Sequence, residues 1–349
     1  MAGGTFQFGI EIELFLGSRK QKSPTFQSLA EEVSQKLRKA GISNHIQQSN
    51  DKSAGKYRKW SIVQEVSIMP SLTHYGIELV SPIYTLPSGS SSSSSSSGGN
   101  GSSTHWATEL SKLFATLHKH FLVSPSAKCA THVHVSGAPA PLSAGELAGL
   151  AKTAVYFEPA VDFLVPADRR GATYWCQSNR ASPALQGLAL GECLAALDGA
   201  AAAGAAAEAA ADGMGTAAVV EAMNLVAAAS PAGRSFRHTA DFVHGKVYKW
   251  NFTGMLPGGS GTVEFRQPPG CATAGDAAAW VRFTLAFVVG AMNHGPALGR
   301  DGVWAGAGES FEELWELLDM GRRGLGWARL DGVDQLFERA VGGDYGYTQ

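Results

Sequence analysis

The sequence has few cysteines and no long hydrophobic run, and both shortages exclude classes of protein. Four cysteines occur in 349 residues, and no two of them form a Cys-x-x-Cys pair. This argues against a disulfide framework or a zinc knuckle. No uninterrupted apolar run reaches the roughly 18 residues that a membrane-spanning helix needs. The first residues do not join a basic stretch to an apolar one, so we expect no secretory signal and a cytoplasmic protein.

The sequence also has no large excess of positive or negative charge. The chain has 28 Lys and Arg against 30 Asp and Glu, for a net charge of −2. Because the basic residues are dispersed, we expect neither nucleic acid nor a membrane surface as partner. The sequence contains no dinucleotide fingerprint, no phosphate-binding P-loop and no HExxH motif. A chain of this length can bury one large core, and we predict a single catalytic domain over residues 1–349.

Two segments of biased composition interrupt the chain. The first segment, at about 88–104, is mostly Ser and Gly, and the second, at about 195–233, is mostly Ala and Gly. Neither composition supplies enough large apolar side chains for a core. We interpret both segments as insertions, the first a flexible surface segment and the second at most a surface helix that buries little.

Hydrophobic spacing elsewhere predicts strands and helices that do not alternate as βαβ units. This order favours an α+β fold built on an antiparallel sheet. The predicted strands are 5–16, 57–69, 75–82, 129–136, 246–253 and 261–267. The predicted helices are 26–40, 105–123, 143–164 with a bend before Pro159, 274–293, 309–319 and 331–341.

The first predicted strand carries two acids on one face. In FQFGIEIELF, residues 6–15, apolar side chains alternate with Gln7, Gly9, Glu11 and Glu13. Successive strand side chains point to opposite faces, so Glu11 and Glu13 share the polar face. Close like charges raise a pKa or require a cation. The sequence therefore poses the question of what neutralises this pair.

Other predicted strands carry polar side chains in the same phase. These are Glu65, Glu78, His132, His134, Glu264 and Arg266. Each signal alone has an ordinary explanation: a solvated sheet face, a surface histidine pair, or a cross-strand ion pair of little value. Together, on otherwise apolar strands of one sheet, they would place five carboxylates and two imidazoles on one face. Such a donor set suits Mg²⁺ or Mn²⁺ better than zinc.

Seven motifs in this order resemble a known family. They are FGIEIEL, the strand from Trp60 to Ser67, GIELVSP, THVHVS, YWCQSNR, KVYKWNF and TVEFRQPPGCAT. This set is similar to the fungal and bacterial amidoligase family, in the carboxylate–amine ligase group with the glutamine-synthetase-like fold. The resemblance covers about 5–88, 104–182 and 235–293. It implies a curved antiparallel sheet, with helices packed on the convex side and the active site on the concave face.

The resemblance also implies roles for individual residues. Metal ligands would be Glu11, Glu13, Glu78, His132 and Glu264. Residues that contact the nucleotide cofactor would be His134, Arg266, Lys249 and Asn251. Arg180 and Arg266 would be catalytic residues that hold phosphate or the substrate carboxylate. Glu65 is our own candidate for a catalytic base, because amine attack needs a deprotonated amine and this carboxylate shares the polar face. The chain departs from the family pattern at Glu65, where relatives often have Asp, and at Pro268 and Pro269, where a His is frequent.

The implied activity is amide synthesis with ATP and Mg²⁺ or Mn²⁺. The resemblance implies an acyl-phosphate intermediate and carboxylate and amine substrates that are small molecules or peptides. Two alternatives stay open: a metal-dependent hydrolase that uses the same acids and His132 to activate water, and a non-catalytic binding module on a ligase-like fold. No subunit-contact signature is recognisable, so the sequence assigns no oligomeric state.

Overall fold

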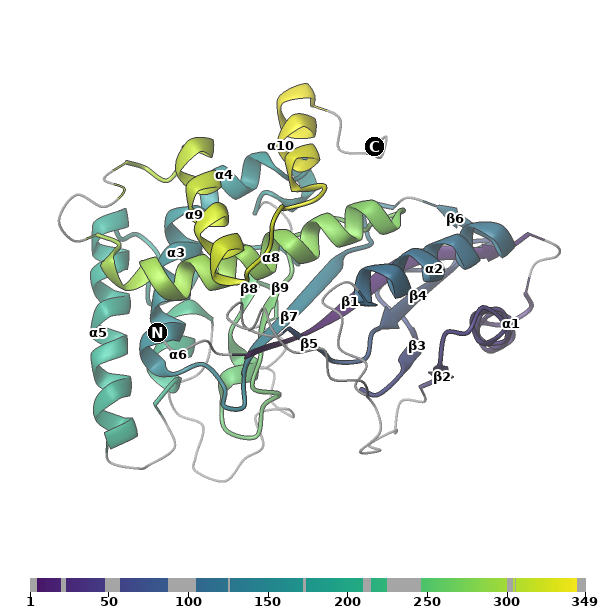
Figure 1. The fold of residues 1–349 in the computed structure, drawn as a ribbon, viewed down its shortest axis with the longest axis horizontal. Helices are drawn as coiled ribbons and strands as arrows, with labels where there is room; N and C mark the ends of the chain where they lie inside the picture. The colour runs from purple at the N-terminus through teal and green to yellow at the C-terminus, as the bar shows by residue number, and fades with distance from the viewer. Residues whose placement is uncertain are drawn as a thin grey trace.

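The fold is a mixed α+β arrangement built on one open sheet (Figure 1). The computed structural model describes residues 5–19, 23–47, 57–86, 105–124, 126–171, 174–209, 215–224, 246–299, 304 and 306–343. The strands are β1 Thr5–Ser18, β2 Asn44–Ile46, β3 Trp60–Gln64, β4 Tyr75–Val80, β5 Tyr84–Leu86, β6 Phe121–Ser124, β7 Thr131–Ala138, β8 Trp250–Asn251 and β9 Val263–Phe265. The helices are α1 Phe26–Lys39, α2 His105–His120, α3 Ala144–Tyr156, α4 Glu158–Phe163, α5 Leu190–Ala209, α6 Ala217–Met223, α8 Ala274–His294, α9 Phe311–Gly324 and α10 Val333–Gly342.

Strand β1 is the centre of the sheet. The strand order is β2-β3-β4-β1-β7-β9-β8, and β5 and β6 pair with the two ends of β1. All pairs are antiparallel except β2 with β3. The predicted α+β class with a mostly antiparallel sheet is therefore confirmed, whereas its glutamine-synthetase-like curvature stays a prediction.

The apolar face of the sheet lies against helices α1, α2 and α8 (Figure 1). Phe8 and Ile12 of β1 are almost fully buried, and Phe8 meets Trp106 of α2 edge to face. Phe265 of β9 stacks on Trp250 of β8 and on Phe283 of α8. Burial of these large side chains fixes which face of each strand turns inward, so the alternating polar side chains turn to the other face.

Helices α5 and α8 are the two described helices long and apolar enough to cross a membrane. By length and composition alone this is a weak indication, because the core helix of a soluble protein passes the same test. The α8 stretch is 83% buried inside the protein, whereas the α5 stretch is 22% buried. The prediction that 274–293 form a buried helix is confirmed.

Two of the predicted ends of strands and helices are wrong, and one predicted bend is confirmed. The strand predicted at 57–69 ends at Gln64, so Val66 is 77% exposed and does not share the buried face of Trp60. The chain turns there because the Glu65 carboxylate accepts a hydrogen bond from Ser67 N at 2.7 Å. The helix predicted at 105–123 ends at His120, and the next four residues form β6. The bend expected before Pro159 is present as the break between α3 and α4.

The Ala/Gly segment buries more than we predicted. Leu197 of α5 is fully buried where this helix packs on α3, and α6 buries Val219 and Val220. Asn224, which follows α6, donates to Trp250 O at 3.1 Å and accepts from Phe252 N at 2.8 Å. The described part of this segment therefore anchors β8. The predicted Ser/Gly insertion at 88–104 lies outside the described residues.

Candidate active site

The pairing register brings the polar side chains of four strands together. Glu13 of β1 lies directly opposite Glu78 of β4, and Glu11 lies opposite His132 of β7. On the far side of β7, His134 lies opposite Glu264 of β9. Side chains of directly paired residues lie about 5 Å apart, so the register alone gathers these groups. Without His132, and with Glu65 added, they form two groups of three potential ligands each.

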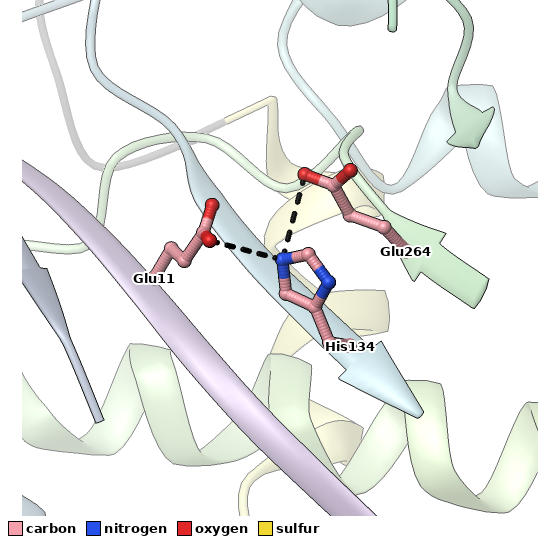
Figure 2. A group of neighbouring side chains, drawn as sticks. All are labelled: Glu11, His134 and Glu264. Atoms are coloured by element: carbon pink, nitrogen blue, oxygen red, sulfur yellow. Dashed lines mark ion pairs between the residues drawn. The ribbon is translucent and has the colours of Figure 1, made fainter. Parts of the chain in front are cut away.

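The histidine group consists of Glu11, His134 and Glu264 (Figure 2). One ligand atom from each residue lies within 4.8 Å of the others. His134 Nε2 lies 3.2 Å from Glu11 Oε1 and 3.7 Å from Glu264 Oε1. This nitrogen is buried and has no hydrogen bond within the described residues. A buried imidazole nitrogen that faces two carboxylate oxygens without a hydrogen bond fits a divalent cation.

The carboxylate group consists of Glu13, Glu65 and Glu78. One oxygen from each lies within 4.8 Å of the others. Glu13 Oε2 also accepts a hydrogen bond from Ala130 N at 2.8 Å, which fixes its orientation. A set made only of carboxylate oxygens suits the hard cations Mg²⁺ and Mn²⁺.

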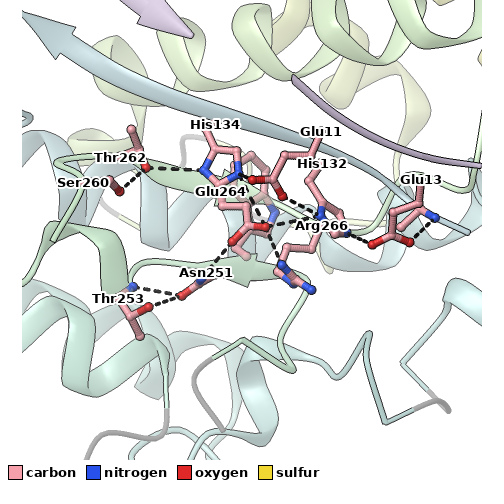
Figure 3. A network of polar contacts seen from close by, with 12 residues as sticks. Glu11, Glu13, His132, His134, Asn251, Thr253, Ser260, Thr262, Glu264 and Arg266 are labelled. Atoms are coloured by element: carbon pink, nitrogen blue, oxygen red, sulfur yellow. Dashed lines mark hydrogen bonds and ion pairs between the residues drawn. The ribbon is translucent and has the colours of Figure 1, made fainter. Parts of the chain in front are cut away.

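His132 lies between the two groups (Figure 3). Its Nδ1 is 3.3 Å from Glu11 Oε2 and 3.4 Å from Glu264 Oε1, and its Nε2 is 3.9 Å from Glu13 Oε1. We predicted His132 as a ligand and His134 as a neighbour of the nucleotide. The geometry adds His134 to the potential ligands and places His132 where it can contact either group.

The two groups differ in what offsets their charge. Burial alone would raise the pKa of Glu264, but Arg266 and the two histidines outweigh it and hold that pKa at about 2. Burial alone would also raise the pKa of Glu11. The effects of His134 and His132 outweigh that of burial, so the pKa of Glu11 lies well below the usual range. The histidine group therefore carries ionised acids whose charges are offset by its own bases.

In the carboxylate group, burial outweighs the effect of the nearby bases. Burial, and then the negative charges of Glu11, Glu13 and Glu65, raise the pKa of Glu78 to about 9. Burial also raises the pKa of Glu13, and Glu65 adds to the shift. Without a cation, Glu78 therefore holds a proton near neutral pH. A bound cation would therefore stabilise this part of the polar face most.

Glu264 is held from both sides (Figure 3). The Arg266 guanidinium donates a short hydrogen bond to Glu264 Oε1, and Asn251 Nδ2 donates to Glu264 Oε2 at 2.8 Å. Asn251 Oδ1 accepts in turn from Thr253 N at 3.0 Å and Thr253 Oγ1 at 2.6 Å, so its orientation is fixed. Asn251, predicted to contact a nucleotide, therefore lies at the site and orients one of its acids.

A family model described as "Putative amidoligase enzyme" matches residues 5–184. The chain belongs to the amidoligase family. The match supports an enzyme of the ligase kind and includes the strands that carry Glu11, Glu78 and His132. No curated protein matches the chain. Strands β8 and β9 of this amidoligase lie beyond the matched range, so the placement of Glu264 rests on the sheet itself.

Two predicted residues of the amidoligase lie apart from the two groups. Lys249 is 1% exposed, and its Nζ donates to Glu158 Oε1 at 2.7 Å and to Asp162 Oδ1 at 2.6 Å. Its ammonium is thus already engaged, and we leave it out of the nucleotide contacts. Arg180 lies beside the same two acids, where it lines a separate pocket.

The structure also points to an arginine that sequence reasoning missed. Arg169 is 6% exposed, donates to Cys129 O, and keeps its Nε without a hydrogen bond within the described residues. Its charge acts on Glu13, counter to the burial that raises the pKa of that acid. Arg169 ends a short 3₁₀ helix, Ala167–Arg169, outside any periodic strand or helix pattern. No sequence signal separates it from the adjacent Arg170.

Proposed function

We propose that this amidoligase is an ATP-dependent carboxylate–amine ligase, with Mg²⁺ or Mn²⁺ on the polar face of its sheet. The observation that carries the proposal is the pair of three-ligand groups on neighbouring strands, with His132 between them. The Nε2 of His134, which makes no hydrogen bond within the described residues, and the raised pKa of Glu78 both fit bound cations. Bound there, divalent cations would neutralise polyphosphate oxygens and the phosphoryl group in transfer.

The proposed reaction has two steps. An oxygen of the substrate carboxylate attacks the γ-phosphorus of ATP, the bond to the β–γ bridging oxygen breaks, and an acyl phosphate and ADP form. The nitrogen of a deprotonated amine then attacks the acyl carbon, and phosphate leaves as the amide forms. Arg266 lies beside Glu264 with its Nε unpaired within the described residues, so it can donate to a phosphoryl oxygen.

Glu65 is the proposed base of the second step. Its Oε1 accepts a hydrogen bond from Ser67 N, which leaves the other oxygen to take a proton from the attacking amine. Glu65 lies at the end of β3 and is half-buried, so an amine can approach it from solvent. The polar face thus offers phosphate-binding groups and a base on one surface.

Cation binding and nucleotide turnover test this proposal together. We expect two Mn²⁺ per chain, one for each group, by isothermal titration. Glu264→Gln should lose one of them and lower ADP release by roughly 100-fold or more. Glu31→Gln, an exposed acid on α1, is the matched control and should change neither quantity.

Two outcomes would contradict the proposal. Unchanged ADP release in Glu264→Gln would favour a non-catalytic binding module. Cleavage of a substrate without nucleotide would favour a metal-dependent hydrolase that uses the same acids and His132.

A further inference from the structure

A buried arginine is joined to Glu13 through a single peptide group. Arg169 Nη2 donates a hydrogen bond to Cys129 O, and Ala130 N donates to Glu13 Oε2 at 2.8 Å. Cys129 C=O and Ala130 N–H are the acceptor and the donor of the same planar peptide group. The guanidinium and the carboxylate therefore lie at the two ends of one chain of two hydrogen bonds.

The position of this chain makes its two hydrogen bonds depend on each other. Arg169, Ala130 and Glu13 are all buried, and hydrogen bonds in series polarise one another where water is excluded. A charged donor also forms a stronger hydrogen bond than a neutral one. The guanidinium on the carbonyl therefore makes the N–H of the same peptide group a better donor to the Glu13 carboxylate.

Both ends of the chain are held in place. Arg169 O accepts hydrogen bonds from Cys176 Sγ at 3.2 Å and from Gln267 Nε2 at 3.0 Å. At the other end, Glu13 N donates to Ala130 O at 3.0 Å, so the main chain and the side chain of Glu13 both bind Ala130. The peptide group is thus a fixed donor, and it holds the carboxylate of Glu13 in one orientation.

The two oxygens of Glu13 therefore have different surroundings. Oε2 is engaged by Ala130 N, whereas Oε1 lies 3.9 Å from His132 Nε2. A carboxylate held in this way offers a cation one oxygen, whereas a carboxylate that turns freely can also bind with both. Ca²⁺ takes about six to eight oxygen ligands and accepts carboxylates in either mode, but Mg²⁺ demands near-ideal octahedral geometry.

We propose that Arg169 is a positioning residue that makes the carboxylate group select Mg²⁺ or Mn²⁺ over Ca²⁺. Through the peptide group of Cys129 and Ala130, it keeps Oε2 of Glu13 engaged and leaves Oε1 as the single ligand atom. Without the guanidinium, the carboxylate turns and binds with both oxygens, which favours the larger ion. The inference rests on the cation site of the proposed function, and it names the residue that decides which metal this site takes.

Competition between cations tests the inference without nucleotide or substrate. The reference protein is Glu264→Gln, which leaves the carboxylate group as the one complete group of the two. Mn²⁺ is bound to the metal-free full chain, and its displacement by Mg²⁺ or by Ca²⁺ is followed by electron paramagnetic resonance. The ratio of the Ca²⁺ affinity to the Mg²⁺ affinity is the readout, because a change in charge alone acts alike on both divalent ions.

Adding Arg169→Met to the reference protein should raise this ratio roughly tenfold. Arg170→Met is the matched control and should keep the reference ratio. It removes the same charge one residue further on, where the side chain donates from Nε to Val165 O at 2.9 Å.

Three results would overturn the inference: an unchanged ratio in Arg169→Met, an equal rise in Arg170→Met, or tighter binding of Ca²⁺ than of Mg²⁺ by the reference protein. The last comparison holds even if Arg169→Met fails to fold. Failure of the ligase proposal gives a different pattern, because a wild type that releases no ADP should still show the rise in Arg169→Met. ADP release by the wild type with an unchanged ratio in Arg169→Met would refute the positioning role and keep the ligase.

Discussion

Glu78→Gln should change how the stability of the metal-free protein depends on pH. Burial and the neighbouring acids raise the pKa of Glu78 in the folded state to about 9, from a value near 4.5 in the unfolded chain. Stability from a raised pKa is fully present below the unfolded pKa and is lost as pH rises through the folded pKa. Between pH 6 and 8 the folded chain holds about one more proton here, so the free energy of unfolding falls by about 1.4 kcal/mol per pH unit.

The assay is urea unfolding in the presence of EDTA at pH 6, 7 and 8. The wild type should lose about 2.7 kcal/mol more than Glu78→Gln between pH 6 and 8, because glutamine does not titrate. His74 and His294, whose pKa values burial lowers, are present in both proteins and cancel in the difference. Glu31→Gln should follow the wild type. Parallel pH curves for wild type and Glu78→Gln would refute the reasoning, since they would mean that Glu78 is ionised without a cation.

Three further predictions follow from the same contacts. Binding of Mn²⁺ at pH 7 should release about one proton more from the wild type than from Glu78→Gln, measured by calorimetry in buffers of different ionisation enthalpy. Glu65→Gln should weaken Mn²⁺ at the carboxylate group, to which Glu65 contributes a ligand, and should lower turnover by roughly 100-fold even when Mn²⁺ saturates both groups; intact turnover at saturating Mn²⁺ would remove Glu65 as the base. Asn224→Ala should destabilise the protein by about 2 kcal/mol or more in urea unfolding, because Trp250 O and Phe252 N lose a buried partner; an unchanged midpoint would show that β8 does not depend on this anchor.

The side-chain faces of the strands could be predicted because they follow from a local period of two. In β1 and β4, buried Ile12 and Ile77 turn to the helices, and Glu13 and Glu78 therefore turn away. The order of the strands in the sheet could not be predicted in this way. The pairing of β1 with β4 on one side and β7 on the other joins residues 59 or more positions apart, and no local pattern fixes that register.

The predictions that failed did so because of contacts between residues far apart in the sequence. The sequence pattern puts Lys249 on the face of Asn251, two residues further on, but its long side chain reaches the two acids of α4, which the sequence does not place nearby. The composition of the Ala-rich helix α5 predicts a surface helix, but its small side chains allow it to pack closely on α3. The role of Arg169 depends on how its charge acts on Glu13, an effect of a short 3₁₀ helix on the first strand that the sequence does not indicate.

The most direct test of the central claim is the identity of the nucleotide product. The protein is incubated with ATP, Mg²⁺, and a panel of amino acids and amines, and ADP, AMP, phosphate and amide are quantified together. The account predicts ADP and phosphate in equal amounts with the amide, all dependent on the cation and lost in Glu264→Gln. AMP with pyrophosphate, or product formed without consumption of nucleotide, would contradict it.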